Sequence, residues 1–287
     1  MMLLEWIKAR KGTAGKDKGE SMQAERRNLL SAQSDFFVRE AYKTLRTNVS
    51  FSLADKEGCP TIMVTSAFQN EGKSITALNL AISYAMADRR VLLIDCDLRR
   101  PKVARLLNER ADAGLSNLIM DPKLRSEAVH PTKIKGLDVI FAGNIPPNPS
   151  ELLGSYRMER ILQDMRKEYD MIVLDSPPVN VVTDAVVLAP QSDGVLFLVR
   201  ANYSERGAVI HAVEQLEYAK AKILGFVLND VETEANLFGY GKYRGKYYGR
   251  YGRYGRYGYS KYGYSKYGYS SLPQEQESGK EETVAKS

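Results

Sequence analysis

The sequence contains very little cysteine and histidine. Its 287 residues include only two of each, Cys59 and Cys96, and His130 and His211. Two cysteines make no disulfide framework, which is typical of a chain kept in a reducing compartment. The two histidines lie far apart in the sequence and have no metal-ligand spacing. The composition therefore excludes a small disulfide-stapled domain and offers no His or Cys metal motif.

Long apolar runs are also missing. No run approaches the roughly 18 to 20 apolar residues that span a bilayer, and the longest, such as Val195–Val199, are typical of buried strands. Residues 1–7 are too short for the apolar region of a secretory signal and follow no basic segment. We therefore expect no membrane span and no secretory signal in this chain.

Acidic residues are absent from one stretch near the end of the chain. Residues 235–274 hold eight Lys and Arg and no Asp or Glu, which leaves 33 basic and 35 acidic residues elsewhere. The formal net charge of +6 thus belongs to this stretch. A basic groove on the folded domain is not indicated, and we expect no nucleic-acid partner.

The same stretch is rich in tyrosine. Twelve of the 18 tyrosines lie between residues 240 and 269, separated by Gly, Lys, Arg and Ser. Without aliphatic residues this segment has no anchor for a core, so we expect residues 237–287 to form a disordered tail. Residues 1–33 are largely polar and are expected to be a mobile arm. One folded domain is predicted between them, over residues 34–236.

Strand and helix patterns alternate between residues 61 and 229. Short apolar runs such as 61–65, 91–94 and 171–174 are separated by helical segments. Continuous apolar strands between helices predict an α/β fold, with a mostly parallel sheet and helices on both faces, in three α/β/α layers. In such folds binding residues gather at the carboxyl ends of the strands.

Residues 67–74, Ala-Phe-Gln-Asn-Glu-Gly-Lys-Ser, follow the first strand and open the first helix of this pattern. They match the Walker A phosphate loop of P-loop NTPases, with Ala in place of the first Gly. Backbone N–H groups of such a loop wrap the phosphates of a nucleotide. Lys73 is expected to reach the β- and γ-phosphates and Ser74 to ligate Mg²⁺, so ATP and Mg²⁺ are the predicted cofactors.

Three aspartates at strand ends complete the predicted site. Asp95 and Asp97 close the second strand, where one can orient Mg²⁺ and the other can accept a proton from an incoming hydroxyl. Asp175 ends an apolar strand, which is a Walker B pattern, and is expected to hold the metal on the side opposite Ser74. The predicted catalytic residues are Lys73, Asp95, Asp97 and Asp175, and the predicted metal ligands are Ser74, Asp97 and Asp175.

A polar residue, Asn229, also ends the last strand. Its amide is suited to reading the adenine edge, and it is equally suited to capping a turn. The residues predicted to bind the nucleotide are Gln69, Asn70, Glu71, Gly72, Lys73, Ser74, Ile75, Arg99 and Asn229.

With these motifs the chain resembles a bacterial tyrosine kinase (BY-kinase) of the capsule and exopolysaccharide type. The segment Asp95–Pro101, Asp-Cys-Asp-Leu-Arg-Arg-Pro, resembles the second Walker motif of that family, and Asn148–Leu153 and Asp175–Pro178 are also similar. The resemblance extends from about Ser34 to the tyrosine-rich tail. It implies an ATP-dependent protein-tyrosine kinase in which Asp95 or Asp97 activates the attacking phenol.

The resemblance also implies a substrate and partners. The kinase would phosphorylate its own tail in trans, regulate capsular or exopolysaccharide synthesis and chain length, and act on other polysaccharide-synthesis proteins. A transmembrane activator of the chain-length-determinant type would hold this cytoplasmic chain at the inner face of the membrane. The implied phosphate acceptors are Tyr240, Tyr243, Tyr247, Tyr248, Tyr251, Tyr254, Tyr257, Tyr259, Tyr262, Tyr264, Tyr267 and Tyr269.

Glu40, Lys43 and Arg46 resemble the helix motif through which members of the family assemble into rings. The usual motif has Arg at the place of Lys43. Lysine keeps the charge but loses the bidentate fork of arginine. The resemblance implies a homo-oligomer, and this departure bears on the stability of the ring.

Two other functions fit parts of the pattern. ATPases of the chromosome-partition or Min type share the fold, but they carry a signature lysine five positions before the catalytic one, where this chain has Phe68. A polymer- or nucleic-acid-binding protein could work through the Tyr/Arg/Gly tail, but that reading leaves the phosphate site unexplained. Phosphotyrosine formed from Mg-ATP distinguishes the kinase from both.

Overall fold

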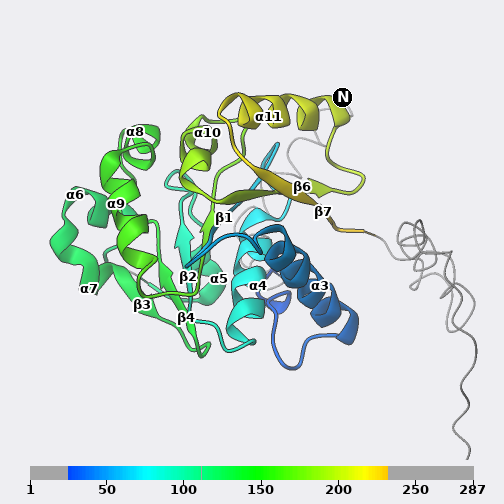
Figure 1. The fold of residues 1–287 in the computed structure, drawn as a ribbon, viewed down its shortest axis with the longest axis horizontal. Coiled ribbons are helices and arrows are strands. Elements are labelled where there is room, and N and C mark those ends of the chain that lie inside the picture. Colours follow the sequence, from blue (N-terminus) through cyan, green and yellow to red (C-terminus); the bar gives the residue numbers. More distant parts are fainter. Residues whose placement is uncertain (1–24, 111, 232–287) are drawn as a thin grey trace, which may run out of the picture. The chain divides into compact units, whose positions relative to one another are not determined.

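The computed structural model describes residues 25–110 and 112–231 (Figure 1). Most of the arm and the whole of the tail that the sequence predicts lie outside these residues. In chain order the elements are α3 (Phe36–Ser52), β1 (Thr61–Ser66), α4 (Lys73–Ala85), β2 (Val91–Asp95), α5 (Val103–Leu107), α6 (Leu115–Met120), η1 (Pro122–Leu124), α7 (Arg125–Ala128), β3 (Val129–Pro131), β4 (Leu137–Ile140), α8 (Pro149–Leu153), α9 (Tyr156–Met165), β5 (Met171–Asp175), α10 (Asp184–Leu188), η2 (Ala189–Gln191), β6 (Gly194–Arg200), α11 (Arg206–Tyr218) and β7 (Ile223–Asn229).

The strands form one seven-stranded sheet in the order β3-β4-β2-β5-β1-β6-β7. Every pairing is parallel except that of the short β3 with β4. Every residue of β1, β2 and β5 is buried, which explains why these strands are apolar without alternation. The predicted α/β fold is confirmed, and the three strands that carry motifs at their ends are neighbours in the sheet.

Helices cover both faces of the sheet (Figure 1). On one face α4 packs against the strands and is covered in turn by α3, so that eleven of the 13 residues of α4 are buried. On the other face α9, α10 and α11 close a second apolar core. Within the described residues no helix has the length and apolarity of a membrane span.

A short segment ahead of α3 packs onto α4. Leu30 is buried, and its backbone N–H donates to Oδ1 of Asn79 at 2.7 Å. The Asn79 amide in turn donates to the Asn28 carbonyl at 2.9 Å. These residues belong to the stretch that the sequence assigns to the N-terminal arm, and their contacts come from α4, a partner about 50 positions away that local sequence does not reveal.

An ion-pair network closes the end of the sheet opposite the strand termini that carry the motifs. The Asp193 carboxylate, which is 12% exposed, accepts from the Thr61 backbone N–H at 2.8 Å and pairs with Arg166 at 3.0 Å and Lys56 at 2.7 Å. It joins the start of β1 to α9 and to the residues before β6. Removing this carboxylate leaves the Thr61 backbone N–H without its acceptor and the half-buried Arg166 guanidinium without its ion-pair partner.

We expect Asp193→Ala to lower the free energy of unfolding by about 3 kcal/mol, because the buried Thr61 N–H and the half-buried Arg166 guanidinium lose their acceptor. Urea denaturation followed by far-ultraviolet circular dichroism measures the change. The matched control is Asp164→Ala, which removes only an exposed pair with Lys167 and is expected to leave the denaturation midpoint unchanged. Equal midpoints for the two variants would contradict the assigned role of Asp193.

Candidate active site

The functional side chains meet where the central parallel strands end. Asp95 of β2 and Asp175 of β5 are partners in the register of these two strands, and β1, on the other side of β5, runs directly into the phosphate loop. Neighbouring strands lie about 4.8 Å apart. The predicted catalytic aspartates and the loop are therefore brought together by strand adjacency, which their positions in the sequence did not fix.

The phosphate loop, residues 67–72, has the backbone geometry of an anion-binding turn. Asn70 and Gly72 both have positive φ, at 62° and 96°, and α4 begins at Lys73. The positive φ favours glycine at position 72, and a Cβ there would lie 2.1 Å from Nδ2 of Asn229, so any other residue would also displace that amide. Asn70 adopts the left-handed conformation, which asparagine tolerates better than most residues.

Lys73 is folded into this loop. Its ammonium group is largely buried and donates to the Phe68 carbonyl at 3.2 Å. Burial lowers the pKa of Lys73, and the nearby Asp175 and Asp97 carboxylates offset part of that effect. The lysine is thus held beside the loop that the sequence predicts to wrap the phosphates.

Glu71, which the sequence groups with the nucleotide-binding residues, is fully buried. Its carboxylate accepts from the Phe68 backbone N–H at 2.7 Å. This contact closes the loop on itself. The side chain of Glu71 therefore supports the loop, and only its backbone remains available to a nucleotide.

Asp175 is the least satisfied polar group of the site. Both of its carboxylate oxygens are buried, and neither accepts a hydrogen bond of normal geometry. Burial raises its pKa to about 7, while the Ser74 hydroxyl and the Lys73 ammonium, both nearby, act to lower it. A buried carboxylate without partners is costly, and a bound cation removes that cost.

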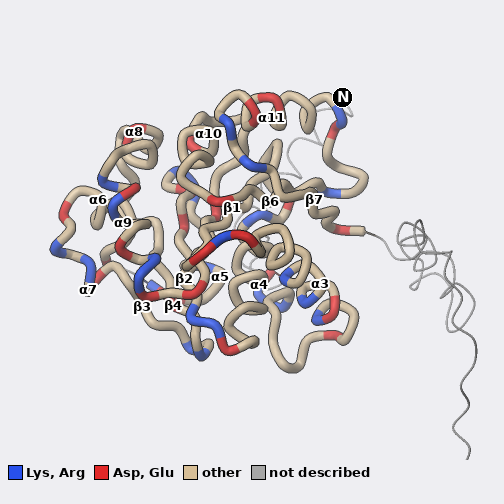
Figure 2. The backbone as a smooth tube through the Cα atoms, in the orientation of Figure 1, with Lys and Arg blue, Asp and Glu red and all other residues tan. Residues whose placement is uncertain are grey.

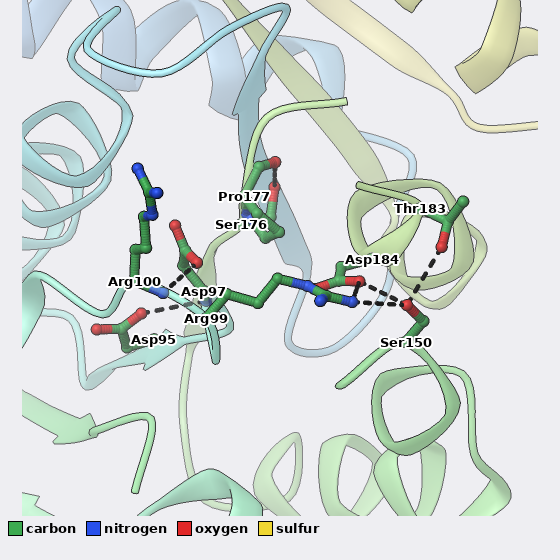
Figure 3. Close-up of polar contacts among 9 residues, drawn as sticks. All are labelled: Asp95, Asp97, Arg99, Arg100, Ser150, Ser176, Pro177, Thr183 and Asp184. Carbon is green, nitrogen blue, oxygen red and sulfur yellow. Dashed lines mark hydrogen bonds and ion pairs between the residues drawn. The ribbon is translucent and has the colours of Figure 1, made fainter. Parts of the chain in front are cut away.

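Asp95 and Asp97 have different surroundings (Figure 3). Asp95 is fully buried and accepts from the backbone N–H groups of Asp97 at 3.2 Å and Val103 at 3.1 Å. Burial, and then the charge of Asp175, hold the pKa of Asp95 well above its usual range. Asp97 is partly exposed and accepts one backbone bond, from Arg100 at 2.9 Å.

Arg99, which the sequence predicts to bind the nucleotide, is engaged by side chains of α8 and α10. Its guanidinium donates to the Asp184 carboxylate at 2.8 and 3.0 Å and to the Ser150 hydroxyl at 3.3 Å. Ser150 also donates to Asp184 at 2.6 Å, and Asp184 is fully buried. The predicted contact of Arg99 with the nucleotide stays a prediction, whereas the contacts that the structure shows join Arg99 to α8 and α10. The physical reason is the buried charge of Asp184, which requires a cation.

Arg100, which the sequence analysis did not select, points away from Arg99 (Figure 3). Its guanidinium donates to the side-chain oxygen of Gln69 in the phosphate loop at 2.8 Å. Of the two adjacent arginines, Arg100 is thus the one joined to the loop. The only available signal was the pair Arg99-Arg100 itself, and sequence could not tell which member faced the site.

Asn229 reaches the phosphate loop from the end of β7. Its amide donates to the Glu71 carbonyl at 3.0 Å. The predicted contact with adenine remains a prediction, and the contact that the structure shows is one that holds the loop. Ser74 and Ile75 stand in the first turn of α4, as the motif requires.

The residues predicted to hold magnesium fit that ion. Mg²⁺ prefers oxygen ligands and usually combines one or two carboxylates with phosphates and waters. The unpartnered Asp175 carboxylate, the partly exposed Asp97 and the Ser74 hydroxyl supply this donor set. No group of three or more Asp, Glu, His or Cys side chains in residues 25–110 and 112–231 forms a metal cage.

The helix expected to mediate assembly is α3. Lys43 pairs with Glu40 on the same helix at 2.6 Å, and Arg46 donates to the Ser83 carbonyl of α4. Phe36 and Phe37 at the start of this helix are exposed. Along the described chain, acidic and basic residues are interspersed (Figure 2).

Comparison with known proteins extends this picture. Residues 61–225, more than half of the chain, match the protein family described as AAA domain. Tyrosine-protein kinase YwqD of Bacillus subtilis strain 168 is 36% identical over 215 residues, which cover 75% of this chain and 89% of that protein. The match therefore includes nearly the whole length of the relative.

Solved structures agree. The crystal structure of the chimerical protein CapA2B2 superposes with a TM-score of 0.66 at 33% identity, covering 70% of this chain and 88% of that chain. The septum site-determining protein MinD of Pyrococcus horikoshii, complexed with Mg-ADP, gives a TM-score of 0.51 at 20% identity, covering 61% and 72%. The second likeness shows a shared P-loop fold and nothing more.

Fold, motifs and relatives thus lead to one family. The phosphate loop follows β1, and the three aspartates lie at or just beyond the ends of β2 and β5. Relatives that are 36% identical over most of their own length are named tyrosine-protein kinase or putative tyrosine-protein kinase. The chain belongs to the bacterial tyrosine kinases, P-loop enzymes that transfer a phosphoryl group from ATP to protein tyrosine.

Proposed function

We propose that this kinase phosphorylates the tyrosines of its own tail in trans and thereby regulates the synthesis and chain length of a capsular or extracellular polysaccharide. The observation that carries the proposal is the juxtaposition of Lys73 and the unpartnered Asp175 carboxylate beside Asp97, in a chain with twelve tyrosines between residues 240 and 269. Relatives named putative tyrosine-protein kinase CapB and tyrosine-protein kinase CpsD support the kinase activity, and the polysaccharide setting rests on the resemblance of the motifs to the family.

The phosphate loop would hold the phosphates of ATP through its backbone N–H groups and the start of α4. Lys73, already positioned by the Phe68 carbonyl, would neutralise charge that develops on the transferred phosphoryl group. Magnesium, held by Ser74, Asp97 and Asp175 together with the phosphates, would screen the negative charge of the nucleotide. Loss of the lysine charge is therefore expected to affect the transition state more than the bound substrate.

Asp97 is the better candidate for the group that accepts the phenol proton. Asp95 is fully buried, and both of its oxygens are engaged by backbone N–H groups. Asp97 is partly exposed, and its oxygen that does not accept from Arg100 has two lone pairs, one for magnesium and one for an incoming hydroxyl. Asp95 would then act by fixing the turn that presents Asp97.

The tail would be presented by one subunit to the site of another, within an oligomer assembled through α3. A transmembrane activator of the chain-length-determinant type would recruit the kinase to the inner face of the membrane, and polysaccharide-synthesis proteins would be further substrates. The exposed Phe36 and Phe37 on α3 support an interface there, because large aromatic side chains are enriched where proteins associate.

We expect Lys73→Met to abolish phosphotyrosine formation, lowering the rate at least about 100-fold, because the transferring phosphate loses its cationic partner. Asp97→Asn is expected to reduce the rate similarly while ADP still binds. Each variant is incubated with Mg-ATP and the activator segment, and an anti-phosphotyrosine assay measures its rate of phosphotyrosine formation. ATP hydrolysis without phosphotyrosine in the wild type would support the partition-type ATPase in place of the kinase.

Transfer in trans is tested by mixing two full-length chains. A tagged Lys73→Met chain, which cannot phosphorylate itself, is expected to acquire phosphotyrosine on residues 240–269 when untagged wild type is added, because the wild-type site acts on a neighbour. Mass spectrometry of the tagged chain locates the phosphates. The control replaces the twelve tail tyrosines of the tagged chain with Phe. An unmodified tagged chain beside a phosphorylated wild type would show that transfer occurs only within one chain.

Asp175→Asn is expected to stabilise the metal-free protein while abolishing kinase activity. The folded pKa of about 7 exceeds the usual 3.8, so the native state retains a proton that the unfolded chain has lost. Wild-type stability therefore falls as pH rises from about 4 to about 7, by up to about 4 kcal/mol. Asparagine removes this titration, and its advantage should be larger at pH 8 than at pH 5.

Urea denaturation at both pH values, with EDTA present, measures this difference. Asp138→Asn serves as the control, since Asp138 of β4 is only partly buried and accepts from the Tyr169 hydroxyl at 2.8 Å. An advantage for Asp175→Asn that does not depend on pH would contradict the assigned cost of the buried carboxylate.

A further inference from the structure

The phosphate loop is supported from outside by a connection that none of the Walker motifs includes. Residues 200–205 link β6 to α11 and contact three consecutive loop residues, Gln69, Asn70 and Glu71. The sheet order places β6 directly beside β1. The two connections that follow these neighbouring strands therefore lie at the same edge of the sheet.

Arg200 is at the centre of this support. One Nη1 hydrogen bond reaches the Asn70 carbonyl at 3.1 Å, and Nε donates to Oδ2 of Asp230 at 2.8 Å. The guanidinium also lies 5.1 Å from the centre of the Tyr203 ring. Asp230 and Tyr203 restrict the guanidinium, so its remaining donor stays directed at the loop.

The hydrogen bond from Arg200 to Asn70 matters because the backbone of Asn70 has an unfavourable conformation. Its φ of 62° is left-handed, a conformation that glycine adopts freely and that costs other residues more. A donor on its carbonyl fixes the orientation of the following peptide. The N–H groups of a phosphate loop bind an anion only while its peptides keep the required orientation.

A second set of contacts carries the support into the loop. Ser204 accepts from the Arg200 backbone N–H at 2.8 Å and donates to the buried Glu71 carboxylate. Glu71 in turn accepts from the Phe68 backbone N–H at 2.7 Å. The Arg200 side chain thus contacts the loop directly at Asn70, whereas its backbone N–H is connected to the loop through Ser204 and Glu71.

We propose that Arg200 is a positioning residue for nucleotide binding, which acts by holding the Asn70 peptide, and that Asp230 positions Arg200. Arg200 itself need not touch the phosphates. Arg200 is 35% exposed and Asp230 59%, so their ion pair contributes little to folding stability. The pair instead helps to fix the geometry of the phosphate loop, because it orients Arg200 toward Asn70. This inference rests on nucleotide binding by residues 67–74 and not on phosphorylation of the tail.

The test is equilibrium titration of the full-length chain with a fluorescent ADP in the presence of Mg²⁺. Arg200→Ala is expected to raise the Kd about five- to tenfold, because a charge-assisted hydrogen bond to the loop is lost. Arg200→Lys, which retains one charged donor but not the fork, should raise it about two- to threefold. Asp230→Ala should raise it about twofold, with no added effect when Arg200 is already Ala.

The matched control is Arg90→Ala. Arg90 forms an exposed pair with Asp170 at 3.1 Å, next to the start of β2 and so at the opposite end of the sheet. It should leave the Kd unchanged, and every variant should keep the wild-type thermal midpoint. Partial rescue by lysine at an unchanged midpoint identifies positioning, since a purely structural role would lower the midpoint.

An Arg200→Ala chain that binds ADP within twofold of wild type would overturn the inference alone. The inference also fails if the thermal midpoint falls in parallel with affinity, or if Arg90→Ala weakens binding equally. Absence of ADP binding by the wild-type chain would overturn the proposed function together with this inference, so the two failures are distinguishable.

Discussion

The burial of two carboxylates at the ends of neighbouring strands is the constraint on which the site depends. Asp95 and Asp175 are register partners in β2 and β5, and both are inaccessible to solvent. Backbone N–H groups satisfy Asp95, whereas Asp175 has no partner of normal geometry. The domain thus holds one uncompensated acid beside Lys73 and the phosphate loop. Such a group favours a proton or a cation, and this preference couples the fold to its nucleotide.

The phosphate loop acquires its shape from three strands. β1 leads into the loop, while the ends of β6 and β7 provide Arg200 and Asn229, which donate to its carbonyls. Asn70 has a left-handed backbone without the freedom of glycine, so contacts outside the loop do part of the work of holding it. The conformation of the loop therefore depends on tertiary contacts, although its residues form one continuous sequence motif.

The segment Asp95–Pro101 serves two purposes at once. Arg100 is joined to the phosphate loop through Gln69, and its backbone N–H donates to Asp97. Arg99 turns the other way and neutralises the buried Asp184 of α10. One arginine holds the scaffold and its neighbour is directed to the site. A substitution of either would therefore act by a different physical route, even though the two are adjacent and chemically identical.

The sequence by itself determined the class of fold and predicted the chemistry of the site. Uninterrupted apolar runs indicate strands buried on both faces, and the Gly-Lys-Ser of the loop with the aspartates at strand ends predicts a nucleotide phosphate. Those signals lie in short contiguous segments, so they can be recognised without knowing which segments are adjacent in the fold. Only the tertiary structure decided that Arg100 and not Arg99 reaches the loop, that Glu71 points inward, and that Arg200 and Asp230 support Asn70. These choices depend on which strands lie side by side and on which buried charge claims each guanidinium, and neither is encoded in spacing along the chain.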